Sequence, residues 1–277
     1  MRILFIYVFL IVGGASEIMA QQPAASEIIK PEVYPEYVMF RKTITRRMNL
    51  LEKQNKSFIS KNSELHVLLI RAVKEGLLKP YKTDSCINLM TDQAFLEATQ
   101  FKLPDDGGFG GGFGGGFGDD TSTDEAAAAD NFVDIDPSEF NKLYIKEDMI
   151  FDRNRSRMYY YIRSLTLYIP TNPNYDINFE KKIASFRYDD VMALLRGPYQ
   201  DVAKWFNEQN EGAHMNMADA FELRLFSAPI VGVSNSENLD IRQKYGDEIN
   251  ANPLNAMIIQ QRLEMELMEY ESNLWEN

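Results

Sequence analysis

The sequence predicts an α+β protein: a small mixed C-terminal domain with a long C-terminal helix, preceded by a mostly helical N-terminal part. Two observations favour this class. Several short segments repeat apolar residues at three- and four-residue steps, as amphipathic helices do, whereas residues 157–169 (RMYYYIRSLTLYI) are rich in aromatic and β-branched residues that favour strands. A third observation divides the chain, because nine of its sixteen glycines lie between Gly107 and Gly118.

Residues 1–20 have the pattern of a cleavable signal peptide. Arg2 gives a positive start, residues 3–12 (ILFIYVFLIV) form an apolar core, and Ala20 is the small residue that signal peptidase needs. The alternative is a buried N-terminal helix. We expect export and a periplasmic location, without direct membrane insertion, because no later segment approaches the roughly 20 apolar residues of a membrane helix.

Residues 21–103 form the predicted N-terminal, mostly helical part. Residues 63–75 (SELHVLLIRAVKE) repeat apolar side chains at helical spacing, and Gly76 is a typical helix stop. Residues 91–101 (TDQAFLEATQF) predict a second short helix that Thr91 caps. Residues 38–53 (VMFRKTITRRMNLLEK), which are basic and apolar, fall within the same part.

Residues 104–131 form a predicted flexible linker. Their glycine run contains a Gly-x-Gly-x-x-Gly pattern at Gly110, Gly112 and Gly115, which in nucleotide-binding proteins binds a pyrophosphate. That site needs an apolar strand before the first glycine and a helix start after the last. Here Pro104 and pairs of aspartates flank the run, so phosphate would be repelled and a flexible spacer fits better.

Residues 132–277 form the predicted C-terminal α+β domain. Residues 144–151 lead through a polar turn at 152–156 into one long strand, or a strand with a bulge, over 157–169. Further short elements are predicted downstream: helices over 189–195 and 217–226, and a strand over 230–233.

The last helix, which Asn252 caps and Pro253 opens, has two opposed apolar faces. One face carries Ala256, Ile259, Leu263, Leu267, Tyr270 and Leu274. The other carries the candidate partner contacts Leu254, Ile258, Met265, Met268 and Trp275. An ordinary surface helix has a single apolar stripe. Either this helix is buried on two sides within its own domain, or its second face meets a neighbouring subunit; the spacing does not choose between them.

The sequence contains no recognisable catalytic, cofactor or metal site. His66 and His214 have no ligand-like spacing to each other or to Cys86, the single cysteine, and neither a nucleophile elbow nor a Walker motif is present. The DIDPSE segment at 134–139 lacks the glycine and distal glutamate of an EF-hand. A net charge of −12 argues against nucleic acid and anionic lipid as partners. We therefore expect no enzyme and no cofactor.

Three blocks in the second half resemble the GldN/PorN family of the gliding-motility and type IX secretion apparatus of the Bacteroidota. They are residues 144–156 (YIKEDMIFDRNRS), 218–235 (ADAFELRLFSAPIVGVSN) and 266–277 (ELMEYESNLWEN), in the family's order and spacing. The chain departs from the family at Met149, where tryptophan is usual, and in its glycine run, which looks like an insertion.

The resemblance implies a non-enzymatic, structural subunit of a periplasmic ring beneath the outer membrane. Such a subunit would self-associate, assemble with a GldK/PorK-type lipoprotein and couple to the GldL/GldM motor proteins. The last helix and residues 218–235 are the expected contact surfaces. The alternative function is a secreted binding module that recognises a protein or polymer through the aromatic strand Tyr159–Tyr168; an exported hydrolase is a third possibility.

Overall fold

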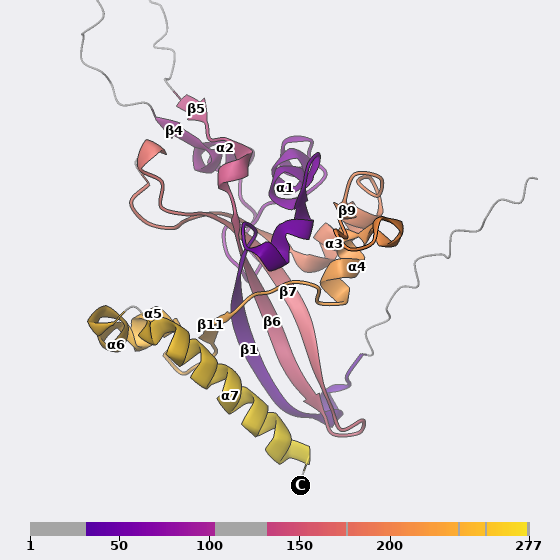
Figure 1. Cartoon of the computed structure of the whole chain (residues 1–277), viewed down its shortest axis with the longest axis vertical. Helices are drawn as coiled ribbons and strands as arrows, with labels where there is room; N and C mark the ends of the chain where they lie inside the picture. Colours follow the sequence, from indigo (N-terminus) through magenta and orange to yellow (C-terminus); the bar gives the residue numbers. More distant parts are fainter. Residues whose placement is uncertain (1–31, 103–131, 176, 238, 253, 276–277) are drawn as a thin grey trace, which may run out of the picture. The chain divides into compact units, whose positions relative to one another are not determined.

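A five-stranded antiparallel sheet organises the part of the chain that the computed structural model describes: residues 32–102, 132–175, 177–237, 239–252 and 254–275 (Figure 1). The strand order is β11-β1-β6-β7-β8. These strands are β1 (Val38–Asn49), β6 (Lys142–Asp152), β7 (Arg157–Ile169), β8 (Lys181–Arg187) and β11 (Ile230–Val233). The predicted signal peptide (1–20) and linker (104–131) lie outside the described residues.

Helices and short strand pairs complete the fold. The helices are α1 (Leu65–Lys74), α2 (Asp92–Thr99), α3 (Tyr188–Arg196), α4 (Met217–Glu222), α5 (Ile241–Lys244), α6 (Gly246–Ala251) and α7 (Asn255–Trp275). The pairs are β2 (Ile59–Ser60) with β3 (Ser63–Glu64), β4 (Gln100–Lys102) with β5 (Phe132–Asp134), and β9 (Lys204–Trp205) with β10 (Met215–Asn216).

The prediction of a mostly helical N-terminal part is wrong. The longest element there is β1, a strand of twelve residues that pairs with β6 along its length and with β11 at Ile44–Arg46. Basic residues on both faces of β1 conceal the alternating pattern that marks a strand. They are tolerated because β6 supplies carboxylates: Arg41 binds Asp148 and Arg46 binds Glu147. Both partners lie about a hundred residues away in sequence.

Several other local predictions are confirmed. The long strand is β7, and its register against β6 shifts between Lys146 and Glu147 as a bulge requires. Thr91 caps α2 by accepting a hydrogen bond from the Ala94 amide. Gly76 ends α1 with a φ of +73°, a left-handed conformation that suits glycine. The helix predicted over 217–226 is shorter, because α4 ends at Glu222.

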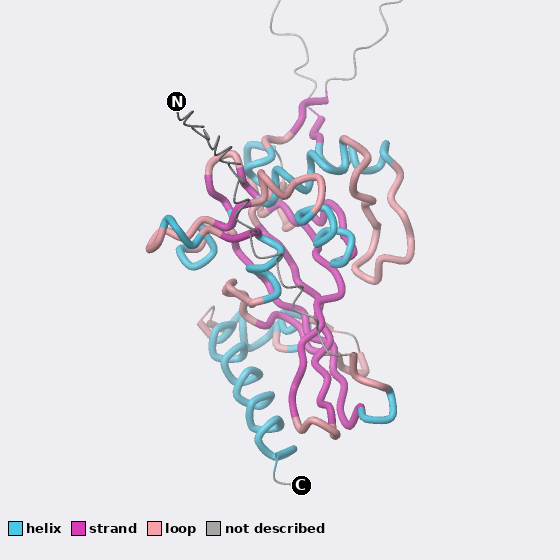
Figure 2. Tube along the Cα trace, turned by 90° about the vertical axis from the view of Figure 1, so that its right-hand side faces the viewer, coloured by secondary structure: helices cyan, strands magenta, loops and turns pink. Residues whose placement is uncertain are grey.

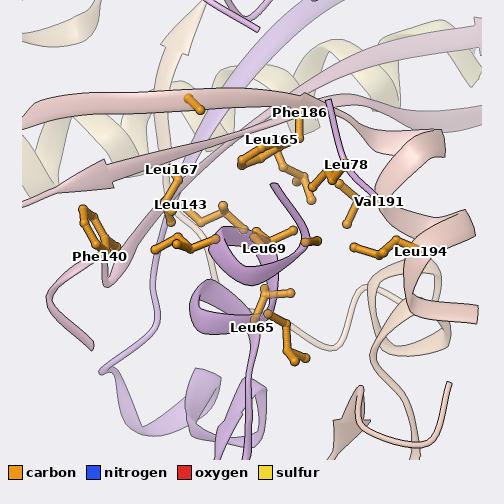
Figure 3. Close-up of a cluster of buried hydrophobic side chains, with 14 of the residues drawn as sticks. Leu65, Leu69, Leu78, Phe140, Leu143, Leu165, Leu167, Phe186, Val191 and Leu194 are labelled. Carbon is orange, nitrogen blue, oxygen red and sulfur yellow. The ribbon is translucent and has the colours of Figure 1, made fainter. Parts of the chain in front are cut away.

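The larger hydrophobic core, which we call the major core, lies where α1, α3 and α4 pack on the sheet (Figure 3). Leu65 and Leu69 of α1 meet Leu143 of β6 and Leu165 of β7 there, all fully buried. The amphipathic pattern of α1 therefore has its expected consequence: one face of the helix is removed from water against the sheet.

A second cluster, the minor core, consists of Ile44, Met149, Ile230, Ile241 and Ile259. Ile44 shares its face of β1 with Met48, which belongs to the major core, because side chains four apart on a strand point the same way and the β1–β6 register is continuous there. The two cores thus occupy one face of the sheet at different positions along the strands.

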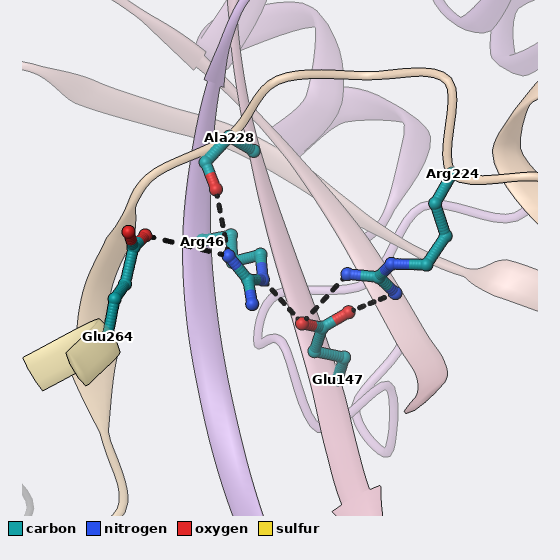
Figure 4. Close-up of polar contacts among 5 residues, drawn as sticks. All are labelled: Arg46, Glu147, Arg224, Ala228 and Glu264. Carbon is teal, nitrogen blue, oxygen red and sulfur yellow. Dashed lines mark hydrogen bonds and ion pairs between the residues drawn. The ribbon is translucent and has the colours of Figure 1, made fainter. Parts of the chain in front are cut away.

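A buried ionic cluster separates the two cores (Figure 4). Glu147 lies opposite Ile44 of the minor core and Ile162 of the major core, and its exposed fraction is 0%. Its carboxylate accepts hydrogen bonds from Arg46 at 2.5 Å and from both terminal nitrogens of Arg224 at 2.7 and 3.1 Å. Two guanidinium groups therefore compensate the cost of burying this charge.

Glu147→Gln should lower the free energy of unfolding by about 2–4 kcal/mol, because it leaves the partly buried cations Arg46 and Arg224 without their carboxylate. Urea denaturation measures this loss. The matched control is Asp134→Asn, which removes the exposed ion pair between Lys74 and Asp134 at 2.9 Å and should change stability by less than about 1 kcal/mol. Equal losses in the two variants would contradict a structural role for Glu147.

His66 makes the fold sensitive to acid. It is buried in α1, and neither ring nitrogen has a hydrogen-bond partner among the described residues. Burial lowers the pKa of His66 from 6.5 to about 4, against smaller opposing effects of Glu64 and Asp136. Below pH 6.5 the unfolded chain therefore binds a proton that the folded chain excludes, so stability falls as the pH drops from 6.5 towards 4.

We expect the wild type to lose about 2 kcal/mol more stability than His66→Leu between pH 7.5 and pH 5, because only the wild type carries this group. Unfolding by urea at the two pH values gives both differences. Parallel losses would show that other groups cause the acid sensitivity.

Candidate assembly interface

One face of α7 packs against the sheet (Figure 2). Ile259 is 1% exposed within the minor core, and the half-buried Leu263 and Leu267 pack against the same cluster. Further along, the Tyr270 ring lies 4.5 Å from the Phe40 ring of β1. This inner face is the first of the two apolar faces that the sequence predicts.

Two side-chain contacts hold the start of α7 in place. Asn252, the predicted cap, accepts a hydrogen bond from the Leu254 amide at 3.0 Å through its side-chain oxygen, but α7 begins at Asn255, two residues after the predicted start at Pro253. Asn255 donates from its side chain to the Glu248 carbonyl of α6 at 2.7 Å. These contacts fix where the helix begins and therefore which residues face outward.

The opposite face of α7 carries exposed apolar side chains, which we call the outer stripe. Its described members are Leu254, Met257, Ile258, Met265 and Met268, exposed by 63%, 60%, 51%, 64% and 62%. Four of them are the predicted partner contacts. The fifth prediction, Trp275, ends α7, and its side chain lies outside what the structure describes. These exposures favour the alternative in which the second face meets a neighbouring subunit.

Met257 was not among the predicted partner contacts. A step of about 100° per residue places it at the margin of the stripe, next to Leu254 and Ile258, so the helical period could have identified it. A groove of about 270 Å³ lies between α7 and β1 and was also not predicted; Phe40, Leu263 and Tyr270 line it and Glu266 borders it. That groove depends on the position of β1, which the sequence did not predict.

Residues 218–235, the other expected contact surface, mostly build the interior. Ala218, Ala220 and Phe221 lie in the major core, and Ile230 lies in the minor core. Leu223, between these buried groups, is about half exposed. With Leu225, which is 36% exposed, this segment has two exposed large apolar side chains among the described residues, fewer than the outer stripe has.

Two tyrosines of the aromatic strand, which is β7, pack against other side chains of the protein. Tyr160 packs against the minor core, and the Arg224 guanidinium lies 5.0 Å from its ring centre. Tyr168 lies 4.3 Å from Tyr144 on β6. Burial raises the pKa of both Tyr160 and Tyr168, with further contributions from nearby carboxylates. Two of the tyrosines proposed to recognise a polymer thus contribute to packing.

Within the described ranges, no group of three or more His, Cys, Asp and Glu side chains is placed to hold a metal ion. Cys86 is buried, and burial raises the pKa of its thiol, which lowers its reactivity. The His214 ring stacks on Phe206 at 4.5 Å. Among the described helices, none has both the length and the apolar character that crossing a membrane requires.

A polar cavity of about 470 Å³ lies beside β1 and β11. Thr43, Asp84, Lys146 and Asp240 are among its lining residues, and Lys146 pairs with Asp84 at 2.9 Å. Burial, together with the charge of Asp84, raises the pKa of Asp240. Two of the charged side chains that line this cavity are already paired with each other, so the cavity offers less to a functional hypothesis than the outer stripe does.

The fold and the outer stripe define a mixed α/β protein whose exposed helix face is of the kind that binds other proteins. A sequence model described as "Gliding motility associated protein GldN" matches residues 33–276. The chain therefore belongs to the GldN family, a component of the gliding-motility and type IX secretion machinery, which confirms the resemblance. No curated protein sequence matches the chain.

Two neighbouring isoleucines test the two faces of α7. Ile259→Asp places a carboxylate in the minor core and should destabilise the protein by about 2–5 kcal/mol or detach α7. Ile258→Asp, one residue away and half exposed, should change stability by less than about 0.5 kcal/mol. Urea unfolding and amide hydrogen exchange across α7 report both effects. If the two variants behave alike, the assignment of inner and outer faces is incorrect.

Proposed function

We propose that this chain is a structural, non-enzymatic subunit of the periplasmic ring of the type IX secretion and gliding-motility apparatus. It reaches the periplasm by means of its signal peptide and associates with the outer membrane through partners. It self-associates, assembles with a GldK/PorK-type lipoprotein and couples to the GldL/GldM motor. Membership of the GldN family supports this role.

The outer stripe is the observation that carries the proposal. Four apolar side chains on one face of the 21-residue helix, and Leu254 immediately before it, are each more than half exposed, while the other face of the helix is anchored to the sheet. Exposing such a surface to water is unfavourable, and permanent assemblies bury surfaces of this kind between subunits. In the role of a structural subunit, the chain would have a neighbouring subunit that covers the stripe.

The buried charges support the same role. Glu147 and Asp148, which are the most obvious candidates for acid–base chemistry on β6, are both bound by arginines. Burial acts to raise the pKa of the Asp148 carboxyl, but hydrogen bonds that it accepts from Arg163 at 2.8 Å, Thr43 at 2.9 Å and Arg41 at 2.6 Å outweigh burial and hold that pKa below the usual range. Both carboxylates therefore accept hydrogen bonds from arginines on other segments and tie those segments to β6.

Affinity purification from the native cell envelope tests the proposal. The tagged wild type should bring down an outer-membrane lipoprotein and an inner-membrane motor protein, identified by mass. The double variant Met265→Asp with Met268→Asp should stay folded, because both side chains are exposed, and should lose at least one companion. Circular dichroism and urea unfolding verify that the variant is folded.

The matched control is Leu96→Asp, which introduces the same group at an exposed apolar position on α2. This variant should keep every companion. A wild-type chain that purifies from the envelope without companions would overturn the proposed function.

A further inference from the structure

We infer that the outer stripe is a coiled-coil-like seam for one amphipathic helix of a different protein, and that basic residues flank the apolar face of that helix. This inference rests on the proposed function and names the chemistry of one partner. It is carried by the spacing of the stripe and by the charges beside it.

The stripe has the spacing of a helix–helix seam. Leu254, Ile258, Met265 and Met268 of the stripe belong to a row of positions separated alternately by four and three residues, and Met257 lies at the margin of this row. The full row is Leu254, Ile258, Gln261, Met265, Met268, Ser272 and Trp275. Two helices pack along such a line because alternating steps of three and four keep one narrow row facing the partner. Gln261 and Ser272, the two polar positions, are exposed like their described apolar neighbours. A helix is therefore the occupant that fits the full length of the row.

Acidic side chains flank this row. Between Asn255 and Trp275 the helix has one arginine, Arg262, and four glutamates, a net charge of −3. Glu264 and Glu271 lie on the edge of the row that faces the sheet, and Arg262 and Glu269 lie on the other edge. Flanking positions of this kind select partners by charge, so lysine or arginine on the incoming helix would complement this surface.

The same charges disfavour a second copy of α7 as the occupant. In a parallel pair, Glu264 would face Glu269 of the other copy. In an antiparallel pair, Glu264 would face Glu271, and this repulsion offsets the attraction between Arg262 and Glu269. A basic helix meets no such repulsion. The acidic surface of the whole chain, with its net charge of −12, acts in the same direction.

Photo-crosslinking in the native envelope tests the nature of the occupant. A benzophenone amino acid replaces Ile258 in one strain and Met265 in another, and mass spectrometry maps the crosslinked residues. We expect both positions to reach the same companion, at sites about seven residues apart in one helix with Lys or Arg beside them. Crosslinks to a second copy of this chain, to a strand, or to an acidic segment overturn the inference.

Charge reversal gives an independent readout. The double variant Glu269→Lys with Glu271→Lys should retain roughly tenfold less companion than the wild type at low salt, and the deficit should shrink as salt rises. The control, Glu208→Lys with Glu237→Lys, makes the same change in net charge at exposed loop positions and should retain the wild-type amount. Equal retention by the two variants overturns the basic-helix inference.

The two proposals fail in different ways. If companions co-purify with the wild type but neither crosslinking position reaches them, the helix seam is wrong and the structural role stands. If no companion co-purifies, the structural role itself fails.

Discussion

One buried carboxylate, Glu147, divides the hydrophobic face of the sheet into two cores. It lies at the centre of the sheet face that both cores share, and burying its charge would be strongly unfavourable without compensation. Arg46 comes to it from β1, and Arg224 from the segment that follows α4. Three distant parts of the chain are thereby held together by charge-assisted hydrogen bonds, and the face is divided into a major and a minor core. Arg46 also donates to the Ala228 carbonyl at 3.2 Å and lies 3.9 Å from Glu264, so the cluster reaches α7 as well.

The division explains why α7 can present a second face. Among the described residues the minor core has five buried members, and Ile259 is the one that α7 contributes. With Leu263 and Leu267 beside it, the helix is attached along a single line, which leaves its opposite side in water. A helix embedded in the major core would have no such face exposed to water. The ionic cluster therefore determines indirectly which apolar surface is available to partners.

The sequence predicted those parts of the structure whose causes are local. The end of α1 at Gly76, the cap of α2 at Thr91 and the length of β7 each follow from residues within a few positions of one another. The two apolar faces of α7 follow from the helical period alone. β1 could not be predicted in this way, because its arginines look unsuitable for a buried strand until the carboxylates of β6 are beside them. The groove next to α7 was missed for the same reason, since β1 forms one of its walls.

On α7 the exposed apolar side chains favour association, and the charged side chains beside them limit which partners can associate. An exposed row of leucine, isoleucine and methionine would by itself promote indiscriminate association, since apolar contact is not directional. Glutamates beside the row add selectivity, because they repel acidic partners and attract basic ones. Methionine suits such a surface, because its flexible side chain adapts to different shapes. On the inference above, this combination would disfavour pairing between copies of α7 and leave the helix accessible to a basic partner helix.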